Sequence, residues 1–292
     1  MPLWKQLLLH AYYTSSYPVR AINRRAAELD GRLPIVVVYY HRVADDSASP
    51  WTISNRTFTE QIDWLRQHFE LVSLRQTQRL IEIGENHRPR VCITFDDGYA
   101  ENCEHAIPLL VKHRIPCMYF VTTRNVLDAT PFPHDVARGK PCPPNTMEEL
   151  RAMAGAGIDI GGHTYTHADL GRLRDPVKLR YELAAARHDL EDALGRAVDY
   201  FAFPFGQHEN LSRAAFRMAR EVGYAGVCSA YGGVNFPGVD PFHIQRVPVD
   251  PWTIRLKNYA TLDPRKISVP RFEYDAPQCN AVLTQVDNLL SE

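Results

Sequence analysis

The sequence predicts an α/β fold, in which about seven to eight parallel strands form a barrel covered by helices. Two observations support this prediction. From residue 35 to residue 249, apolar stretches with strand character alternate with stretches of helical periodicity, an order typical of parallel βαβ units. The strand-like stretches are almost continuously apolar, as expected for strands that are buried on both faces.

The first half of the barrel is expected to alternate strands and helices without interruption. Strands are predicted over 35–41, 70–74, 91–95 and 117–123, and helices over 58–69, 75–84 and 101–113. The first helix illustrates the pattern, because Phe58, Ile62, Leu65 and Phe69 recur at helical spacing. Gly84 stands at the end of the second helix, where a glycine is common.

The second half follows a break in this alternation. The break is PFPHDVARGKPCPPN (131–145), whose five prolines predict a loop or an insertion. Strands are then predicted over 158–162, 200–203, 224–229 and 242–249, and helices over 146–157, 175–195 and 211–222. Asp175 and Pro176 begin the longest helix and Gly195 follows its end.

Composition places the chain among ordinary globular proteins of 292 residues. It is 45% hydrophobic and 23% charged. Because its net charge is only −1, it has no overall positive potential that would attract nucleic acid, and no nucleic-acid partner is expected. None of the six cysteines forms a C-x-x-C pair. A chain of this length with such cysteines is not a disulfide framework, and we expect a reducing compartment.

Three segments are expected along the chain: an N-terminal helical extension (1–34), one barrel domain (35–250) and a C-terminal tail packed on that domain (251–292). The apolar run near the N-terminus, LLL, is shorter than a secretory or membrane-spanning segment requires. A cytoplasmic location is therefore expected. The extension is either a helix packed on the domain or an amphipathic helix pair that rests on the inner membrane face, carrying Trp4, Tyr12, Tyr13, Arg20, Arg24 and Arg25.

Candidate catalytic groups stand where predicted strands end, which is where barrels of this kind place their sites. The three stretches are FDDG (95–98), GGHTYTHADL (161–170) and FAFPFG (201–206). Asp96 and Asp97 are adjacent carboxylates at the end of an apolar strand, so a cation is expected close to them.

A divalent metal ion is one such cation. His163 and His167 are four residues apart, and on a helical turn both rings would face one side. Two imidazoles and one carboxylate suit Zn²⁺, Fe²⁺ and related ions. The alternatives are an exposed histidine pair and a solvated turn at D-D-G. His41 is either an active-site or a structural residue, and His134 and Asp135 lie either near the site or on a surface loop.

The order T-F-D-D-G, H-T-x-x-H and F-P-F-G resembles the NodB-homology polysaccharide deacetylases, carbohydrate esterase family 4, from about Ile35 to Val249. The resemblance implies a distorted, TIM-like (β/α) barrel with an incomplete ring. It also implies a hydrolase that removes N-acetyl groups with one divalent metal ion. Zinc is preferred, and cobalt, nickel, iron and manganese are alternatives.

The resemblance also implies roles for individual residues. Asp97, His163 and His167 match the metal ligands, and Asp96, which follows Thr94 and Phe95, matches the general base that takes a proton from water. Pro204, Phe205 and Gly206 match the segment that lines the sugar groove, where a main-chain N–H helps to hold the oxyanion.

Two positions depart from the family pattern. Ala202 stands where the family often has the arginine that orients the base, so Arg246 or Arg42 is expected to replace it. The family's acid is commonly a late-strand histidine, and here His243 and His41 compete for that role. Tyr99, Tyr165, Phe205 and Trp252 are either sugar-stacking residues or core residues.

The expected partner is an N-acetylated sugar or oligosaccharide, as a nucleotide- or lipid-linked glycan precursor. Peripheral membrane contact through the N-terminal helix would suit the lipid-linked form. The alternatives are hydrolysis of a different amide or ester (a cyclic ureide or an O-acetyl group) and a carbohydrate-binding module that has lost catalysis. Retention of Asp96, Asp97, His163 and His167 together favours an enzyme, because a binding module does not need the base.

Overall fold

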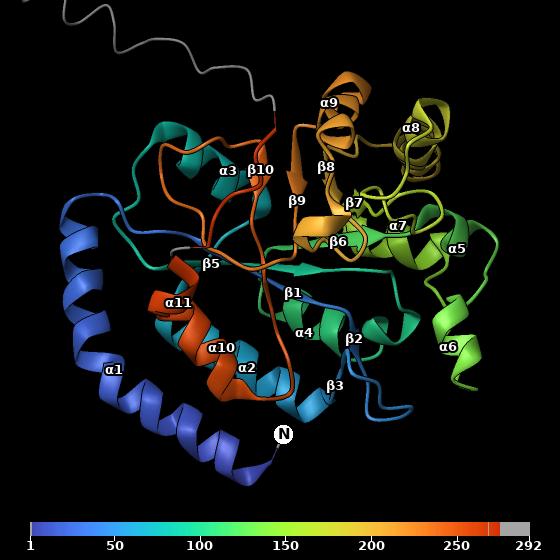
Figure 1. The fold of residues 1–292 in the computed structure, drawn as a ribbon. Helices are drawn as coiled ribbons and strands as arrows, with labels where there is room; N and C mark the ends of the chain where they lie inside the picture. Colours follow the sequence, from blue (N-terminus) through green and yellow to red (C-terminus); the bar gives the residue numbers. More distant parts are fainter. Residues whose placement is uncertain (1, 268, 275–292) are drawn as a thin grey trace, which may run out of the picture.

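In the computed structural model, which describes residues 2–267 and 269–274, a curved parallel sheet is surrounded by helices (Figure 1). Along the sheet the strand order is β10-β9-β8-β7-β6-β5-β1-β11, and every pair in it is parallel. The bounds are β1 Val36–Tyr40, β5 Arg90–Phe95, β6 Cys117–Val121, β7 Asp159–Gly162, β8 Tyr200–Ala202, β9 Gly226–Cys228, β10 His243–Ile244 and β11 Val247–Pro248. This is the predicted distorted (β/α) barrel.

One stretch of chain joins the two edges of this sheet. The sequence predicts a single strand over 242–249, but the structure divides it, and β10 pairs with β9 whereas β11 pairs with β1. Gln245 and Arg246 lie between the two pieces. The chain leaves regular pairing there because the Gln245 N–H donates to the Asn235 side chain and the Arg246 carbonyl accepts from the Gly232 N–H.

The strand residues are buried on both sides of the sheet, which explains their continuous apolar character. Alternate residues supply two separate cores, because successive side chains of a strand point to opposite faces. Val37, Cys92, Phe120 and Ile244 belong to the smaller core. Their neighbours Val36, Val38, Ile93 and Tyr119 belong to the larger one, which the helices share.

Most predicted helices are present, with boundaries that local chemistry explains. They are α2 Asn55–His68, α3 Leu74–Ile83, α4 Ala106–Lys112, α7 Met147–Gly155, α8 Pro176–Leu194 and α9 Arg213–Val222. The Asp175 side chain caps α8 by accepting from the Val177 and Lys178 N–H groups, and Gly195 ends it in the left-handed conformation.

Two connections differ from the sequence prediction. The helix expected over 101–113 is divided into a 3₁₀ turn, η1 Ala100–Cys103, and α4. The proline-rich break at 131–145 contains a short helix, α6 Pro133–Ala137. The remaining small elements are β2 Arg42–Val43, β3 Thr52–Ile53, β4 Glu70–Leu71, α5 Thr123–Leu127, η2 His208–Asn210 and α11 Pro264–Ile267.

The N-terminal extension is one long helix, α1 Leu3–Leu29, and not the helix pair that the sequence suggests as one alternative. It lies along the outside of the domain beside α10 Thr253–Ala260 (Figure 1). The buried Arg20 guanidinium donates to the Asn258 carbonyl, the Asn258 side chain and the Thr261 hydroxyl. No helix in the described residues is long and apolar enough to cross a bilayer.

Part of the predicted C-terminal tail also packs on the domain. The Arg271 side chain donates to the His243 and Asp240 carbonyls, and the Phe272 N–H donates to the Tyr231 hydroxyl. Residues 275–292 of the predicted tail lie outside the described residues.

We expect Arg20→Ala to destabilise the protein by about 1–3 kcal/mol, because it leaves buried acceptors of Asn258 without their donor. Denaturant unfolding measures the change. Arg25→Ala on the same helix is the matched control. Its side chain is exposed and pairs with Glu28, so the change should stay within about 0.5 kcal/mol. Equal stability of the two variants would contradict the anchoring role of Arg20.

Candidate metal centre and active site

The two adjacent carboxylates at the end of β5 point in different directions because the chain turns sharply there. The Asp96 N–H still pairs with the Tyr40 carbonyl in the sheet. Asp97 then takes a left-handed conformation at φ 76°, and Gly98 follows at φ 89°. As a result, the Asp96 carboxylate contacts an arginine and the Asp97 carboxylate contacts two histidines.

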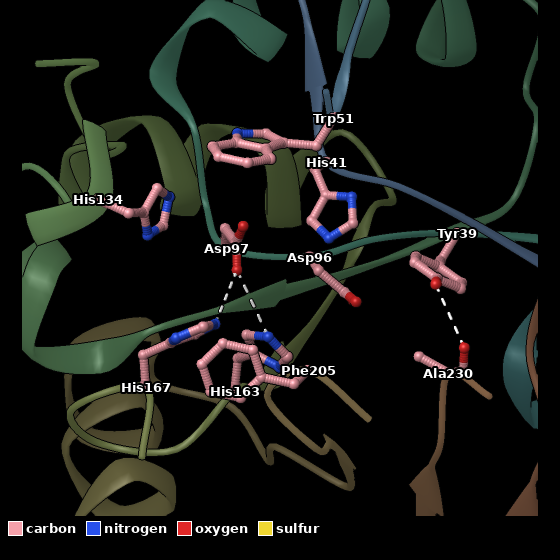
Figure 2. Close-up of a pocket in the computed structure, with 10 residues that line it drawn as sticks. All are labelled: Tyr39, His41, Trp51, Asp96, Asp97, His134, His163, His167, Phe205 and Ala230. Carbon is pink, nitrogen blue, oxygen red and sulfur yellow. Dashed lines mark hydrogen bonds and ion pairs between the residues drawn. The ribbon is translucent and has the colours of Figure 1, made fainter. Parts of the chain in front are cut away.

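Asp97, His163 and His167 form a candidate metal centre (Figure 2). Asp97 Oδ1 lies 3.4 Å from His163 Nε2 and 3.3 Å from His167 Nε2. Within the described part of the chain, these three are the one group of such side chains whose ligand atoms all lie within 4.8 Å of one another. His163 Nδ1 lies 2.8 Å from the Ala202 carbonyl, to which it donates when Nε2 is the metal ligand.

The three side chains fit a divalent ion. Asp97 Oδ1 is buried and has no hydrogen-bond donor among the described residues. Burial alone would raise the pKa of Asp97, but the two imidazoles that face its carboxylate lower that pKa well below the usual range. An ionised carboxylate beside two imidazole nitrogens is a ligand set that suits Zn²⁺ or Fe²⁺ and leaves coordination positions open.

The histidine spacing works for a different reason from the one the sequence suggests. His163 and His167 do not lie on a helical turn, because the chain after β7 is irregular. Thr164 and His167 both have left-handed backbones, at φ 60° and φ 61°. These turns fold the loop back so that the two rings lie 5.1 Å apart, centroid to centroid.

Asp96 is held by Arg246 through two parallel hydrogen bonds of 2.6 and 2.9 Å. The guanidinium is fully buried and also donates to Thr94 Oγ1 and to the Ser229 carbonyl. Burial would lower the pKa of Arg246, but the Asp96 carboxylate raises it. Arg246 therefore makes to Asp96 the contact that the resemblance implies for the arginine absent at Ala202.

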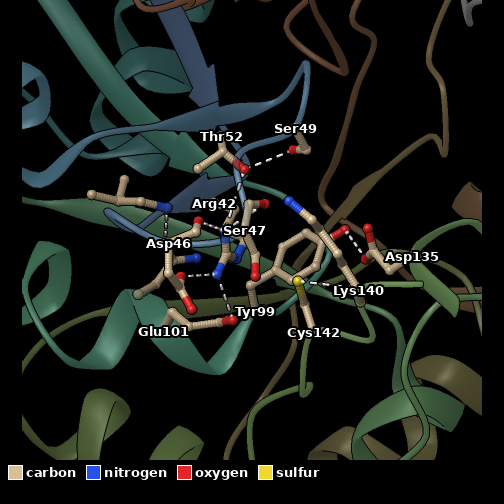
Figure 3. A network of polar contacts seen from close by, with 12 residues as sticks. Arg42, Asp46, Ser47, Ser49, Thr52, Tyr99, Glu101, Asp135, Lys140 and Cys142 are labelled. Carbon is tan, nitrogen blue, oxygen red and sulfur yellow. Dashed lines mark hydrogen bonds and ion pairs between the residues drawn. The ribbon is translucent and has the colours of Figure 1, made fainter. Parts of the chain in front are cut away.

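Arg42, the other arginine considered for that position, does not reach Asp96. It donates to the Asp46 and Glu101 carboxylates and approaches the Thr52 hydroxyl (Figure 3). These contacts tie the segment between β2 and β3 to η1. The expectation that Arg42 orients the base is therefore wrong, and the reason is that two nearer carboxylates bind it.

A cavity of about 350 Å³ opens over the metal centre and Asp96. Its lining is aromatic and polar, and consists of Tyr39, His41, Trp51, Asp96, Asp97, His134, His163, His167, Phe205 and Ala230. Figure 2 shows His41 on the side of the two aspartates opposite His163 and His167. Phe205 projects at the rim with 56% of its surface exposed, close to the ring of His167.

The proline-rich segment 131–145 contributes to this cavity. His134 lies in the lining, where its ring contacts the Trp51 ring edge-on at 4.9 Å. Asp135 is buried below and accepts a hydrogen bond of 2.9 Å from the Tyr99 hydroxyl. Arg138 lies over the Trp51 ring and donates to the Ala48 carbonyl. The segment 131–145 therefore holds the loop that carries Trp51.

Several predicted site residues lie elsewhere. Tyr99 was expected to bind substrate, but it is buried beneath the cavity and anchors Asp135. His243 was a candidate acid, but its side chain is buried against Phe216 and Tyr231, with Nε2 bonded to Ser229. Burial lowers the pKa of His243 well below the usual range. Neither Tyr99 nor His243 lines the cavity.

Pro204 and Gly206 shape the turn that presents Phe205. The Gly206 N–H pairs with the Pro204 carbonyl, and the Gly206 carbonyl accepts from the Ala230 N–H. A Cβ on Gly206 would lie 2.7 Å from the Ala230 nitrogen, which explains the glycine. Because the Gly206 N–H is already bonded within the turn, it is not the main-chain donor that the resemblance implies for an oxyanion.

Trp51, Tyr39 and Ala230 were missed by the sequence reasoning. Strand alternation could have identified Tyr39. It lies in β1 two residues before His41, and side chains two residues apart in an extended chain point to the same face. Trp51 and Ala230 lie in loops, where periodicity carries no signal. The one available signal for Trp51 was its place at the start of WTISNRTFTEQIDWL (51–65), a stretch that carries part of the family resemblance.

The fold and the site together define a class of protein: a parallel (β/α) barrel with a candidate metal centre at the carboxyl ends of its strands. Residues 83–227 match the family described as "Polysaccharide deacetylase". The segment 83–227 is therefore a polysaccharide deacetylase domain, and it holds Asp96, Asp97, His163 and His167.

Similarity to individual proteins extends beyond the matched segment. The chain is 23% identical over 227 residues to the "Putative polysaccharide deacetylase YxkH" of Bacillus subtilis. The aligned residues cover 77% of this chain and 74% of that protein. It is 24% identical over 133 residues to the poly-β-1,6-N-acetyl-D-glucosamine N-deacetylase of Staphylococcus epidermidis, covering 39% of this chain and 46% of that protein.

The fold likewise resembles solved structures. The structure of IcaB from Ammonifex degensii superposes with a TM-score of 0.65 at 27% identity, covering 78% of this chain and 97% of that chain. This likeness confirms the fold class that the sequence predicts.

We expect His167→Ala to lose bound metal, because it removes one of three protein ligands. Elemental analysis after reconstitution with zinc should find one ion per chain in the wild type, and an affinity lowered by at least about 100-fold in the variant. His134→Ala is the matched control, since His134 lines the same cavity without belonging to the ligand group. A wild type that binds no metal, or equal loss in both variants, would contradict the assignment.

Proposed function

We propose that the protein is a metal-dependent hydrolase that removes N-acetyl groups from an N-acetylated sugar or oligosaccharide. The observation that supports this best is the pair of carboxylates at the end of β5. Asp97 faces two imidazoles, and Asp96, beside it, is held by a buried arginine at the same cavity. A site that only bound sugar would not need an oriented second carboxylate next to a metal ligand set.

The residues have separate roles in this proposal. Asp97, His163 and His167 would hold the ion, for which zinc is the preferred candidate. When bound, a divalent ion polarises the acetamide carbonyl and makes water a better nucleophile. Asp96 acts as the general base that takes the proton from the attacking water. Arg246 fixes both Asp96 oxygens, so the base does not have to reorient during the reaction.

We assign the general acid to His41. It lies at the end of β1 and lines the cavity on the opposite side of Asp96 and Asp97 from the metal-binding histidines (Figure 2). From this position in the lining, the His41 ring would donate a proton to the leaving amine of a substrate bound in the cavity. Trp51 and Phe205 provide aromatic faces on which the sugar ring can stack.

The names of relatives support the substrate class. One relative is named for deacetylation of poly-β-1,6-N-acetyl-D-glucosamine and another, from Bradyrhizobium, is called a chitooligosaccharide deacetylase. We further propose that the substrate of this chain is a lipid-linked precursor, reached from the cytoplasm at the inner membrane face. The exposed apolar side of α1 supports the membrane contact.

We expect Asp96→Asn to lower the rate of acetate release from N-acetylglucosamine oligomers by about 100- to 10,000-fold, because it removes the general base. Bound metal should be retained. Asp46→Asn is the matched control, since Asp46 pairs with Arg42 away from the cavity, and its rate should be unchanged. Failure of the metal-loaded wild type to release acetate, with cleavage of O-acetyl esters or cyclic ureides instead, would replace this function with the alternative hydrolase.

We expect His41→Gln and His243→Gln to differ. The His41 variant should lose at least about 100-fold in kcat, because no group then protonates the leaving amine. His243→Gln should keep the wild-type kcat per folded molecule, because its ring lies outside the cavity. The reverse pattern would move the acid to His243.

A further inference from the structure

One side of α1 is apolar and faces away from the rest of the protein. More than half of the large apolar side chains that are exposed in the described residues belong to this helix. We name as the outer stripe the seven that share its outward side: Leu3, Trp4, Leu7, Leu8, Val19, Ile22 and Leu29. Between 56% and 71% of the surface of each is exposed.

The outer stripe is a true helix face. Leu3 and Leu7 are four residues apart, and so are Trp4 and Leu8. At the other end Ile22 follows Val19 by three residues and precedes Leu29 by seven, and the intervening position Ala11 is also exposed. The opposite face, with Leu9, Tyr13 and Arg20, is the one that is buried or half-buried. Helices of globular domains usually point their apolar face inward, so α1 is oriented the other way round.

Polar anchors hold the helix in this orientation. Arg20 reaches Asn258 and Thr261, and the Tyr12 hydroxyl donates to the Asp263 carboxylate at 3.0 Å. Both anchors lie on the packed side of α1. Turning the stripe inward would break these buried contacts, so its exposure is maintained by the fold.

The charges beside the stripe indicate what covers it. Lys5 lies over the Trp4 ring at 5.3 Å. Near the other end Arg24 and Arg25 share the carboxylate of Glu28, which leaves that group of charges net positive. Glu28 is the single acidic residue between Leu3 and Leu29. Tryptophan beside lysine is typical of a membrane–water interface, and clustered cations attract anionic headgroups. A water-soluble protein partner would not require this combination.

We propose that α1 docks on the surface of a bilayer that contains anionic lipids, with the outer stripe in the interfacial region and the barrel on the aqueous side. The helix lies in the membrane plane and, at 27 residues, extends for about 40 Å. This inference rests on the proposed function, because it specifies the membrane contact proposed above. Docking of α1 can nevertheless be measured without the deacetylase reaction.

The test is co-sedimentation of the full chain with vesicles of phosphatidylcholine, with and without phosphatidylglycerol. The wild type should bind the anionic vesicles more tightly than the neutral ones, and less tightly at high salt. The double variant Leu7→Glu and Leu8→Glu should bind at least about tenfold more weakly, because two charges enter the apolar face. Val177→Glu on α8, where the side chain is 76% exposed, is the matched control and should bind like the wild type.

Three results would overturn the inference. The first is a wild type that binds neither vesicle, or a double variant that binds as well as the control. The second is a dimer in light scattering that the double variant dissociates, which would make the stripe an interface between copies. The third is a lower unfolding temperature of the double variant than of the control, which would mean that this chain itself covers the stripe. Acetate release from a soluble oligosaccharide, measured in parallel, tests the deacetylase proposal separately.

Discussion

The pair of carboxylates at the end of β5 is the constraint on which the rest of the site depends. Two buried negative charges on consecutive residues repel each other and each needs its own cation. The chain separates them by a left-handed turn at Asp97, and each then finds a different partner. Arg246 neutralises Asp96, whereas Asp97 is left for the two imidazoles and the ion they would share with it.

The partners come from distant parts of the chain. Arg246 is 150 residues from Asp96 in sequence, and His163 and His167 follow a strand two positions along the sheet from β5. Parallel strands bring their carboxyl ends to one edge, so such residues meet without specific contacts between the intervening segments. The loops then add the aromatic lining. Trp51 comes from the loop between β2 and β3, and His134 comes from the short helix α6.

Half of the non-glycine residues that have left-handed backbones in the described part of the chain lie at the same edge. Asp97, Thr164, His167 and Phe205 are non-glycine residues with left-handed backbones, and three of them line the cavity. Such conformations cost about 1–3 kcal/mol each and persist only where the surrounding structure imposes them. Here backbone hydrogen bonds flank these positions: the Asp96 N–H donates to the Tyr40 carbonyl, the Thr123 N–H to the Thr164 carbonyl and the Ala230 N–H to the Gly206 carbonyl. The site is therefore preorganised by groups that do not touch the substrate.

Periodicity in the sequence was sufficient for the barrel, because continuous apolar strands between amphipathic helices have few other ways to pack. The motif residues were identifiable because Asp96, Asp97 and His163 come directly after strands and His167 follows His163 by four residues. Arg246 could be proposed only as a replacement for an absent arginine. The division of 242–249 into two strands and the burial of Tyr99 and His243 depend on tertiary contacts with Asn235, Asp135 and Ser229, which no local pattern contains.

The stretch that joins both edges of the sheet has a consequence for protein synthesis. It carries Arg246, so the barrel closes and Asp96 gains its counterion in the same step. While a ribosome is still adding the residues before 246, the emerging barrel contains a carboxylate that has no arginine to bind. A nascent chain that still lacks residue 246 therefore lacks the contact between Asp96 and Arg246 that would stabilise the barrel. The last strands to be translated decide when the domain becomes stable.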